Sequence, residues 1–137
     1  MRPTGSGVRV LAAVAAGGVV GAETRYLLGV TFPAAPGAWP WTTFGINISG
    51  CLLIGVLYTV LAGMDRPSPL LRPALGVGVL GGYTTFSTWS VETLQLAAHG
   101  RYGLALGYAL TVPVTAGAAC MAGVTLTRGI RRARWTR

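Results

Sequence analysis

Four long apolar runs occupy most of this 137-residue chain, and short polar segments rich in Pro or Gly separate them. A helix needs roughly 20 apolar residues to cross the hydrocarbon core of a bilayer, and each run is long enough to do so. The runs predict membrane-spanning helices over residues 8–30, 41–62, 74–97 and 102–126. Only 10% of the residues are charged, against about 25% in an average soluble domain, which favours an all-α membrane protein.

The basic residues are distributed unevenly along the chain. All eleven are Arg, and five of them fall within 128–137, which we expect to form a basic cytoplasmic tail. Four spans place both termini on one side, and that side holds nine arginines, whereas the opposite side holds only Arg101. Because Lys and Arg are enriched in cytoplasmic segments, both termini are predicted to be cytoplasmic. No basic residue recurs along the spans as it would beside a nucleic acid, so we expect no nucleic-acid partner.

Small residues recur at helix-packing spacing in three of the four runs. In lipid, glycines four residues apart let two helix backbones approach closely, and they predict a compact bundle. Because four helices enclose little space for a polar pathway, we also expect a dimer. The pairs are Gly17 with Gly21, Gly78 with Gly82, and Gly103 with Gly107.

The second run carries polar residues on one helical face. Thr43, Asn47 and Gly50 follow one another at i, i+4 and i+7. The amide of Asn47 can donate to an anion or bond a neighbouring backbone carbonyl. A buried Asn also commonly joins two helices within a membrane, and both interpretations stay open.

A similar face on the fourth run holds the hydroxyls of Tyr108, Thr111 and Thr115, with Pro113 loosening the backbone nearby. A Thr hydroxyl in a helix commonly bonds back to the carbonyl four residues earlier. Three hydroxyls on one face favour a polar pathway, and back-bonding remains the alternative.

The first run contains an acidic and a basic residue at membrane depth. Glu23 and Arg25 are two residues apart, so they point to different faces and do not form a simple helical ion pair. Arg25 can extend its guanidinium to the membrane surface or attract anions to an entrance. Ionisable groups within a membrane are costly, which makes both residues candidates for function.

The third run contains the segment that most resists a continuous helix. Gly81-Gly82 is followed by a group of hydroxyl residues, and Gly and Thr both have low helix propensity. We therefore expect a break in the third helix, where freed backbone carbonyls can bind a cation. Phe86 and Trp89, three apart, share a face. Core packing is the usual role of such a pair, but the positive edges of aromatic rings can also meet an anion.

These residues resemble the CrcB/Fluc family of fluoride channels over essentially the whole chain. The resemblance rests on three motifs in the family's order and spacing. They are Gly17-Gly18-x-x-Gly21-Ala22-x-x-Arg25-Tyr26, then Thr42-x-x-x-x-Asn47-x-x-Gly50, then Gly81-Gly82-x-Thr84-Thr85-Phe86-Ser87-Thr88 with Glu92 beyond it.

The resemblance implies an antiparallel dimer of four-helix subunits with two narrow fluoride pathways. It implies a structural Na⁺ at the dimer centre, bound by the backbone carbonyls of Gly81 and Thr84. It also assigns Arg25 to an entrance and Glu92 to an acidic position beside the pathway. The pathway residues so implied are Asn47, Thr85, Phe86, Ser87, Thr88, Trp89, Tyr108, Thr111 and Thr115.

The sequence departs from the family pattern in two places. Trp89 stands where Phe is usual, and the fourth-helix pattern is matched only approximately by Tyr108 with Thr111 or Thr115. An indole is bulkier and adds an N–H donor, so one pathway could be altered or closed. The arginine bias predicts insertion in a single orientation. The expected partner is thus an identical antiparallel subunit or, as our hypothesis, an oppositely oriented paralogue.

The predicted function is passive export of fluoride through the inner membrane of a bacterium, which reduces fluoride toxicity. A membrane potential that is negative inside drives F⁻ outward with about 2.3 kcal/mol per 100 mV. We do not expect an enzyme, because the single His lies in a loop and no carboxylate–nucleophile pairing is present in the sequence. The alternative is a proton-coupled small multidrug transporter that uses Glu23.

Overall fold

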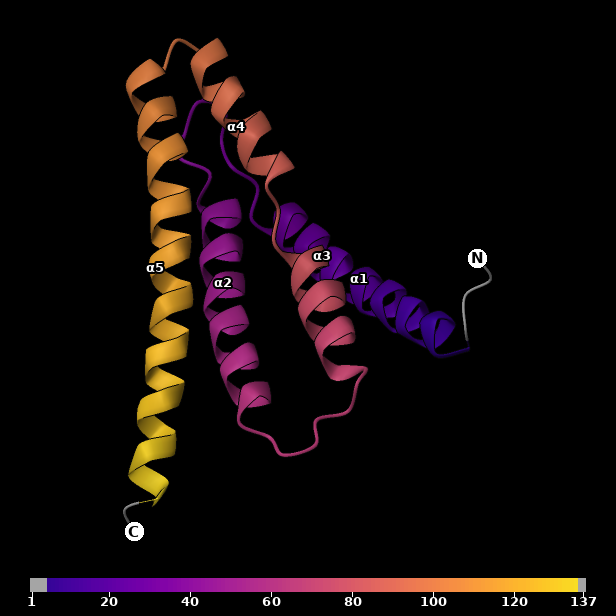
Figure 1. Ribbon diagram of the computed structural model, residues 1–137. Coiled ribbons are helices and arrows are strands. Elements are labelled where there is room, and N and C mark those ends of the chain that lie inside the picture. Colours follow the sequence, from indigo (N-terminus) through magenta and orange to yellow (C-terminus); the bar gives the residue numbers. More distant parts are fainter. Residues whose placement is uncertain (1–4, 136–137) are drawn as a thin grey trace.

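The computed structural model describes residues 5–135, and every regular element in that range is a helix (Figure 1). The elements are α1 (Gly5–Thr31), α2 (Trp41–Ala62), η1 (Arg72–Leu80), α3 (Gly81–Tyr83), α4 (Ser87–Ala98) and α5 (Tyr102–Trp135). The π-helix η1 continues directly into α3, so η1, α3 and α4 together form the third of four helical segments. The all-helical prediction is confirmed for the described residues.

Three of the helices are long and apolar enough to cross a membrane. They are α1 from Ser6, α2, and α5 as far as Ala133. Large apolar side chains such as Leu94 and Val114 are each 70% exposed on the single chain, as expected for surfaces that contact lipid or another subunit. The helices therefore have the lengths and surfaces of a multi-pass membrane protein.

The third helical segment is not regular throughout. Thr84 follows α3 with extended backbone angles, φ −74° and ψ 155°, and helical structure resumes only at Ser87. The N–H and the hydroxyl of Thr84 both donate to the carbonyl of Leu80, at 3.0 and 2.9 Å. One carbonyl thus receives both donors of Thr84, and the chain leaves the helix at this residue. Figure 1 shows the short link between α3 and α4.

The helices pack in two pairs whose backbones touch at glycines. Helix α2 lies along α5, while α1 crosses η1 and α3 (Figure 1). A Cβ added at Gly55 of α2 would overlap the carbonyl oxygen of Cys120 on α5, and one added at Gly21 of α1 would overlap that of Val79. Only a residue without a side chain allows this approach.

The predicted glycine pairs fall into two groups. Gly17, Gly21, Gly78 and Gly82 lie where α1 meets η1 and α3, as expected for close packing. Gly103 and Gly107 do not mediate a comparable contact: an added Cβ at Gly103 meets nothing within 4 Å, and one at Gly107 meets only the ring of Trp39, at 3.9 Å. On this part of α5, contact with α4 is made instead by larger side chains around Tyr108.

Helix α5 continues beyond the predicted end of the fourth span at residue 126 and includes much of the basic segment. Arg131 on this extension donates to the carbonyls of Thr59 and Gly63, at 3.4 and 3.2 Å, and so supplies partners for the end of α2. Arg2 and Arg137, together with the rest of the predicted tail after residue 135, lie outside the described residues.

The largest fully buried side chain belongs to Tyr108 on α5. It packs with Leu96 of α4 and with Val112, and the ring of Trp39 meets it edge-on with centroids 5.1 Å apart. This cluster fixes α4 against α5 and places the Tyr108 hydroxyl between the helices that carry the polar residues described next.

Candidate functional site

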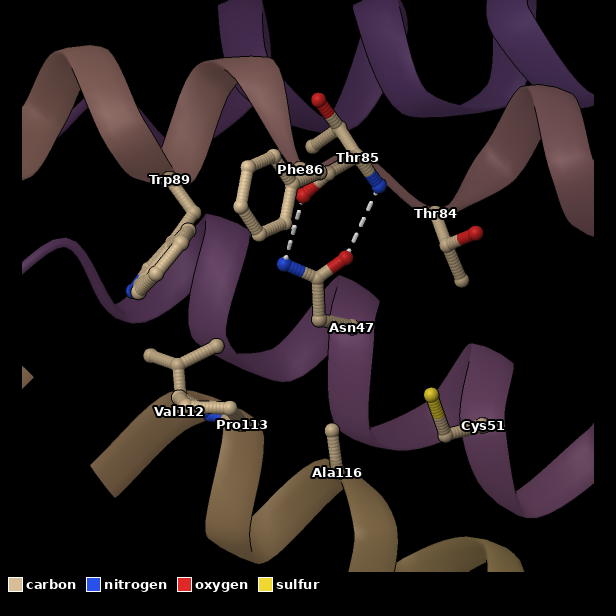
Figure 2. Close-up of a pocket in the computed structure, with 9 residues that line it drawn as sticks. All are labelled: Asn47, Cys51, Thr84, Thr85, Phe86, Trp89, Val112, Pro113 and Ala116. Carbon is tan, nitrogen blue, oxygen red and sulfur yellow. Dashed lines mark hydrogen bonds between the residues drawn. The ribbon is translucent and has the colours of Figure 1, made fainter. Parts of the chain in front are cut away.

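Asn47 of α2 holds the non-helical link of the third segment through both ends of its side-chain amide. Its Nδ2 donates to the carbonyl of Thr85 at 3.0 Å, and its Oδ1 accepts the N–H of Thr85 at 2.8 Å (Figure 2). Asn47 is buried, and its two bonds satisfy both main-chain polar groups of Thr85, the N–H and the carbonyl, which belong to consecutive peptide units. Of the two roles left open for this amide, the structure shows the bond to a neighbouring backbone.

The start of α4 is capped by a hydroxyl of the same link. The Oγ1 of Thr85 accepts the N–H of Thr88 at 3.1 Å and donates to the Thr88 hydroxyl at 3.0 Å. A hydroxyl three residues before an N–H at the start of a helix is the usual N-terminal cap. The Thr88 hydroxyl accepts in this pair, so its own proton remains available to a further partner. Ser87 is exposed and lies 3.4 Å from the same Thr85 oxygen.

Glu92 of α4 connects three helices. One carboxylate oxygen accepts the hydroxyl of Thr43 on α2, and the other accepts the hydroxyl of Tyr108 on α5, both at 2.7 Å. Thr43 and Tyr108 are both buried. The sequence places Thr43 on the same polar face as Asn47, one turn earlier, but it predicts neither a place for Thr43 in the pathway nor its bond to Glu92. The Tyr108 hydroxyl is engaged by this carboxylate.

Phe86 and Trp89 lie side by side, with ring centroids 4.8 Å apart and planes inclined by 56°. The indole Nε1 of Trp89 donates to the carbonyl of Tyr108 at 3.3 Å, so α5 holds this ring in place. The N–H expected as an additional anion donor is therefore used within the chain. Phe86 is 78% exposed on the single chain.

A cavity of about 220 Å³ lies between these rings, the Asn47 amide and α5 (Figure 2). Figure 2 shows Phe86 and Trp89 on one side and the α5 residues Val112, Pro113 and Ala116 on the other, with Asn47 between them. Its lining comprises Asn47, Cys51, Thr84, Thr85, Phe86, Trp89, Val112, Pro113 and Ala116.

A second, more polar cavity of about 540 Å³ opens between α1, α2 and α4. Among the described residues, Thr85 alone lines both cavities, so the link held by Asn47 separates them. Arg25 reaches this cavity from α1 while its Nε donates to the Gly82 carbonyl at 3.0 Å. The polar lining residues are Glu23, Arg25, Thr42, Thr43, Thr85, Thr88 and Glu92.

Four expected pathway residues line neither of these cavities. The hydroxyl of Thr115 bonds back to the carbonyl of Thr111 at 2.6 Å, which is the alternative left open for this face. The residues absent from both linings are Ser87, Tyr108, Thr111 and Thr115. Because α5 turns Val112, Pro113 and Ala116 towards the aromatic pair, the wall there is apolar rather than a row of hydroxyls.

The backbone around Gly81 and Thr84 offers oxygen atoms of the kind that Na⁺ prefers. Two neighbouring carbonyls already have partners: Leu80 accepts from Thr84, and Gly82 accepts from Arg25. The described residues contain no group of three or more His, Cys, Asp or Glu side chains that could hold a metal. A cation bound here would have main-chain oxygens among its ligands.

A family model described as "CrcB-like protein, Camphor Resistance (CrcB)" matches residues 12–124 of the chain. Fluoride-specific ion channel FluC 1 of Streptomyces coelicolor is 44% identical over 118 residues, covering 83% of this chain and 77% of the relative. FluC 1 of Mycolicibacterium paratuberculosis is 44% identical over 126 residues, covering 92% and 93%. FluC 3 of Streptomyces avermitilis is 49% identical over 96 residues, but the chain spans only about half of that relative's length (47%).

Proposed function

The chain belongs to the CrcB-like family, and from this premise we propose that it is a subunit of a passive fluoride channel that lets F⁻ leave the cytoplasm. The observation that carries the proposal is the Asn47–Thr85 pairing, which holds Thr85 between two cavities: Phe86 and Trp89 line the smaller one, and Thr88 lines the more polar one. The relatives are named as fluoride-specific ion channels, and this favours the channel over a small multidrug transporter.

The proposed path joins the two cavities past Thr85. Fluoride is small and strongly hydrated, so a selective path has to replace its water with hydrogen-bond donors. The Thr88 hydroxyl can be such a donor. Its oxygen already accepts from Thr85, so its proton is available, and Thr88 lines the polar cavity. Beyond the link, Phe86 and Trp89 line the smaller cavity, and the edges of their rings carry partial positive charge.

We propose that the functional unit is an antiparallel dimer in a bacterial inner membrane, with both termini cytoplasmic. Support comes from the exposure of Phe86 on a single chain, which leaves the aromatic side of the smaller cavity open to another subunit. The partner is either a second copy or an oppositely oriented paralogue. The excess of arginines on the terminal side favours the paralogue, and S. avermitilis has two similar proteins, named FluC 2 and FluC 3.

We further propose that the carbonyls of Gly81 and Thr84 from both subunits would hold a structural Na⁺ in this dimer. Such an ion would supply a fixed positive charge that draws four main-chain oxygens together. The engagement of the adjacent Gly82 carbonyl by Arg25 supports this assignment, because it removes one competing oxygen and leaves a defined set.

The direct test is fluoride efflux from liposomes that contain the purified protein alone or together with a paralogue from the same organism. We expect fluoride efflux in at least one preparation and no chloride efflux. Phe86→Ile should abolish efflux through the path that Phe86 lines without unfolding the protein, whereas Leu94→Ile, exposed on α4, should leave it unchanged. The absence of fluoride efflux from both preparations would overturn the proposal.

A further inference from the structure

Glu23 is an acidic residue of α1 that the proposed pathway does not use. It lies eight residues before the end of α1, which corresponds to about 12 Å along the helix. Its side chain is exposed and lines the cavity of about 540 Å³. Within residues 5–135, no hydrogen bond or ion pair is formed by its carboxylate. A carboxylate at this depth is costly unless it faces water or serves a function.

The other charged groups of this cavity are each engaged. Both oxygens of Glu92 accept hydroxyl protons, from Thr43 and Tyr108. The Nε of Arg25 donates to a backbone carbonyl. The cavity therefore contains one guanidinium and two carboxylates, an excess of one negative charge, and Glu23 is the carboxylate to which none of the described residues donates a hydrogen bond.

We propose that Glu23 sets the rate at which anions enter this cavity, by holding an unbalanced negative charge at the mouth of the path. The inference rests on the proposed fluoride conduction and concerns its regulation. A fixed charge beside a wet, low-dielectric cavity changes the local concentration of a mobile ion of either sign. For an anion the change is a reduction, and it is large only where dissolved salt does not screen the charge.

The test compares Glu23→Gln with wild type in liposomes at a fixed fluoride gradient. Ionic strength is varied with a salt of large impermeant ions. At about 0.01 M, where the screening length is about 30 Å, the variant should pass fluoride about two- to tenfold faster. At about 1 M the screening length is about 3 Å, and the two rates should converge.

Two further variants separate local from general effects of charge. Glu23→Asp keeps the charge and should retain the wild-type salt dependence. Asp65→Asn removes the same charge from an exposed position between α2 and η1, and it should leave the rate unchanged at every salt concentration. Equal size-exclusion profiles in detergent establish that each variant is folded.

The inference is overturned if Glu23→Gln does not raise the low-salt rate, if its increase persists at high salt, or if Asp65→Asn reproduces it. Failure of the proposed function gives a different result, because the wild-type protein itself would then pass no fluoride.

Discussion

The side-chain amide of Asn47 bonds both main-chain polar groups of Thr85: its Nδ2 donates to the carbonyl at 3.0 Å, and its Oδ1 accepts the N–H at 2.8 Å. A side chain here supplies the N–H and the carbonyl of one residue with the partners that the preceding and following turns would provide in an uninterrupted helix. The pairing needs both a donor and an acceptor on the same planar group. Asn and Gln are the two residues whose side chain is an amide and so carries both.

Replacing Asn47 by Asp should therefore break the link. The carboxylate keeps the acceptor but turns a second acceptor towards the Thr85 carbonyl, which leaves that part-buried carbonyl without its donor. We expect a loss of about 1–3 kcal/mol in stability, together with loss of fluoride efflux. Unfolding in detergent and liposome efflux measure the two effects.

Ser90→Ala is the control for that substitution, because the Ser90 hydroxyl is exposed and donates to the Phe86 carbonyl, one turn earlier in the same segment. It should change neither stability nor efflux. An Asn47→Asp protein with wild-type stability would show that the pairing does not hold the link.

Tyr108→Phe should destabilise the junction of α2, α4 and α5. The substitution removes one of the two hydroxyl donors of Glu92 and leaves an oxygen of that carboxylate unpaired. A hydrogen bond to a charged group is worth about 1.5–3 kcal/mol, and we expect a loss of that size on denaturation in detergent. Tyr102→Phe, at an exposed position of the same helix, should have no comparable effect. Equal stabilities of the two variants would contradict the assigned role of Glu92.

Trp89→Phe should increase fluoride efflux. The smaller ring restores width to the cavity of about 220 Å³ and removes the bond between the indole and the Tyr108 carbonyl. We expect a faster efflux and a loss of about 1 kcal/mol in stability. Trp41→Phe, which alters an exposed indole at the start of α2, should change neither property. An unchanged rate in Trp89→Phe would mean that this ring does not limit passage.

Gly21→Ala should separate α1 from the third helical segment. The added methyl group would overlap the Val79 carbonyl, and since that atom is backbone, the helices themselves must shift. Overpacking of this kind costs about 1–3 kcal/mol. Gly18→Ala, on the same helix with nothing within 4 Å of the added Cβ, is the matched control. A lower unfolding temperature for Gly21→Ala than for Gly18→Ala would support the close contact between α1 and the third segment. Equal unfolding temperatures would contradict it.

Some of this architecture could be predicted from the sequence because it depends on composition over long windows. The length of the apolar runs predicts helices that can cross a membrane. The low helix propensity of Gly81, Gly82 and Thr84 indicates that the third run is the one least suited to a continuous helix. The glycine pairs of α1, η1 and α3 could also be predicted from the sequence, because their spacing alone places both members on one face of a helix.

Other features depend on which faces meet, and a single sequence does not specify that. The bridge from Glu92 to Thr43 and Tyr108 joins three helices, so no spacing within one helix reveals it. The rotation of α5 turns apolar residues towards the aromatic pair. The indole N–H of Trp89 therefore meets a backbone carbonyl of α5, and the hydroxyl of Thr115 bonds a carbonyl of its own helix.

The start of α4 at Ser87 has one more consequence, since it places a helix terminus in the middle of the third segment. The peptide dipoles of α4 add up to a partial positive charge at that start, beside Phe86 and the Asn47 pairing, and those of η1 and α3 leave a partial negative charge at Tyr83. An anion at the start of α4 and a cation at the end of α3 would thus meet opposite and permanent potentials only a few residues apart. Neither potential involves a titratable group, so this part of the site should not change with pH.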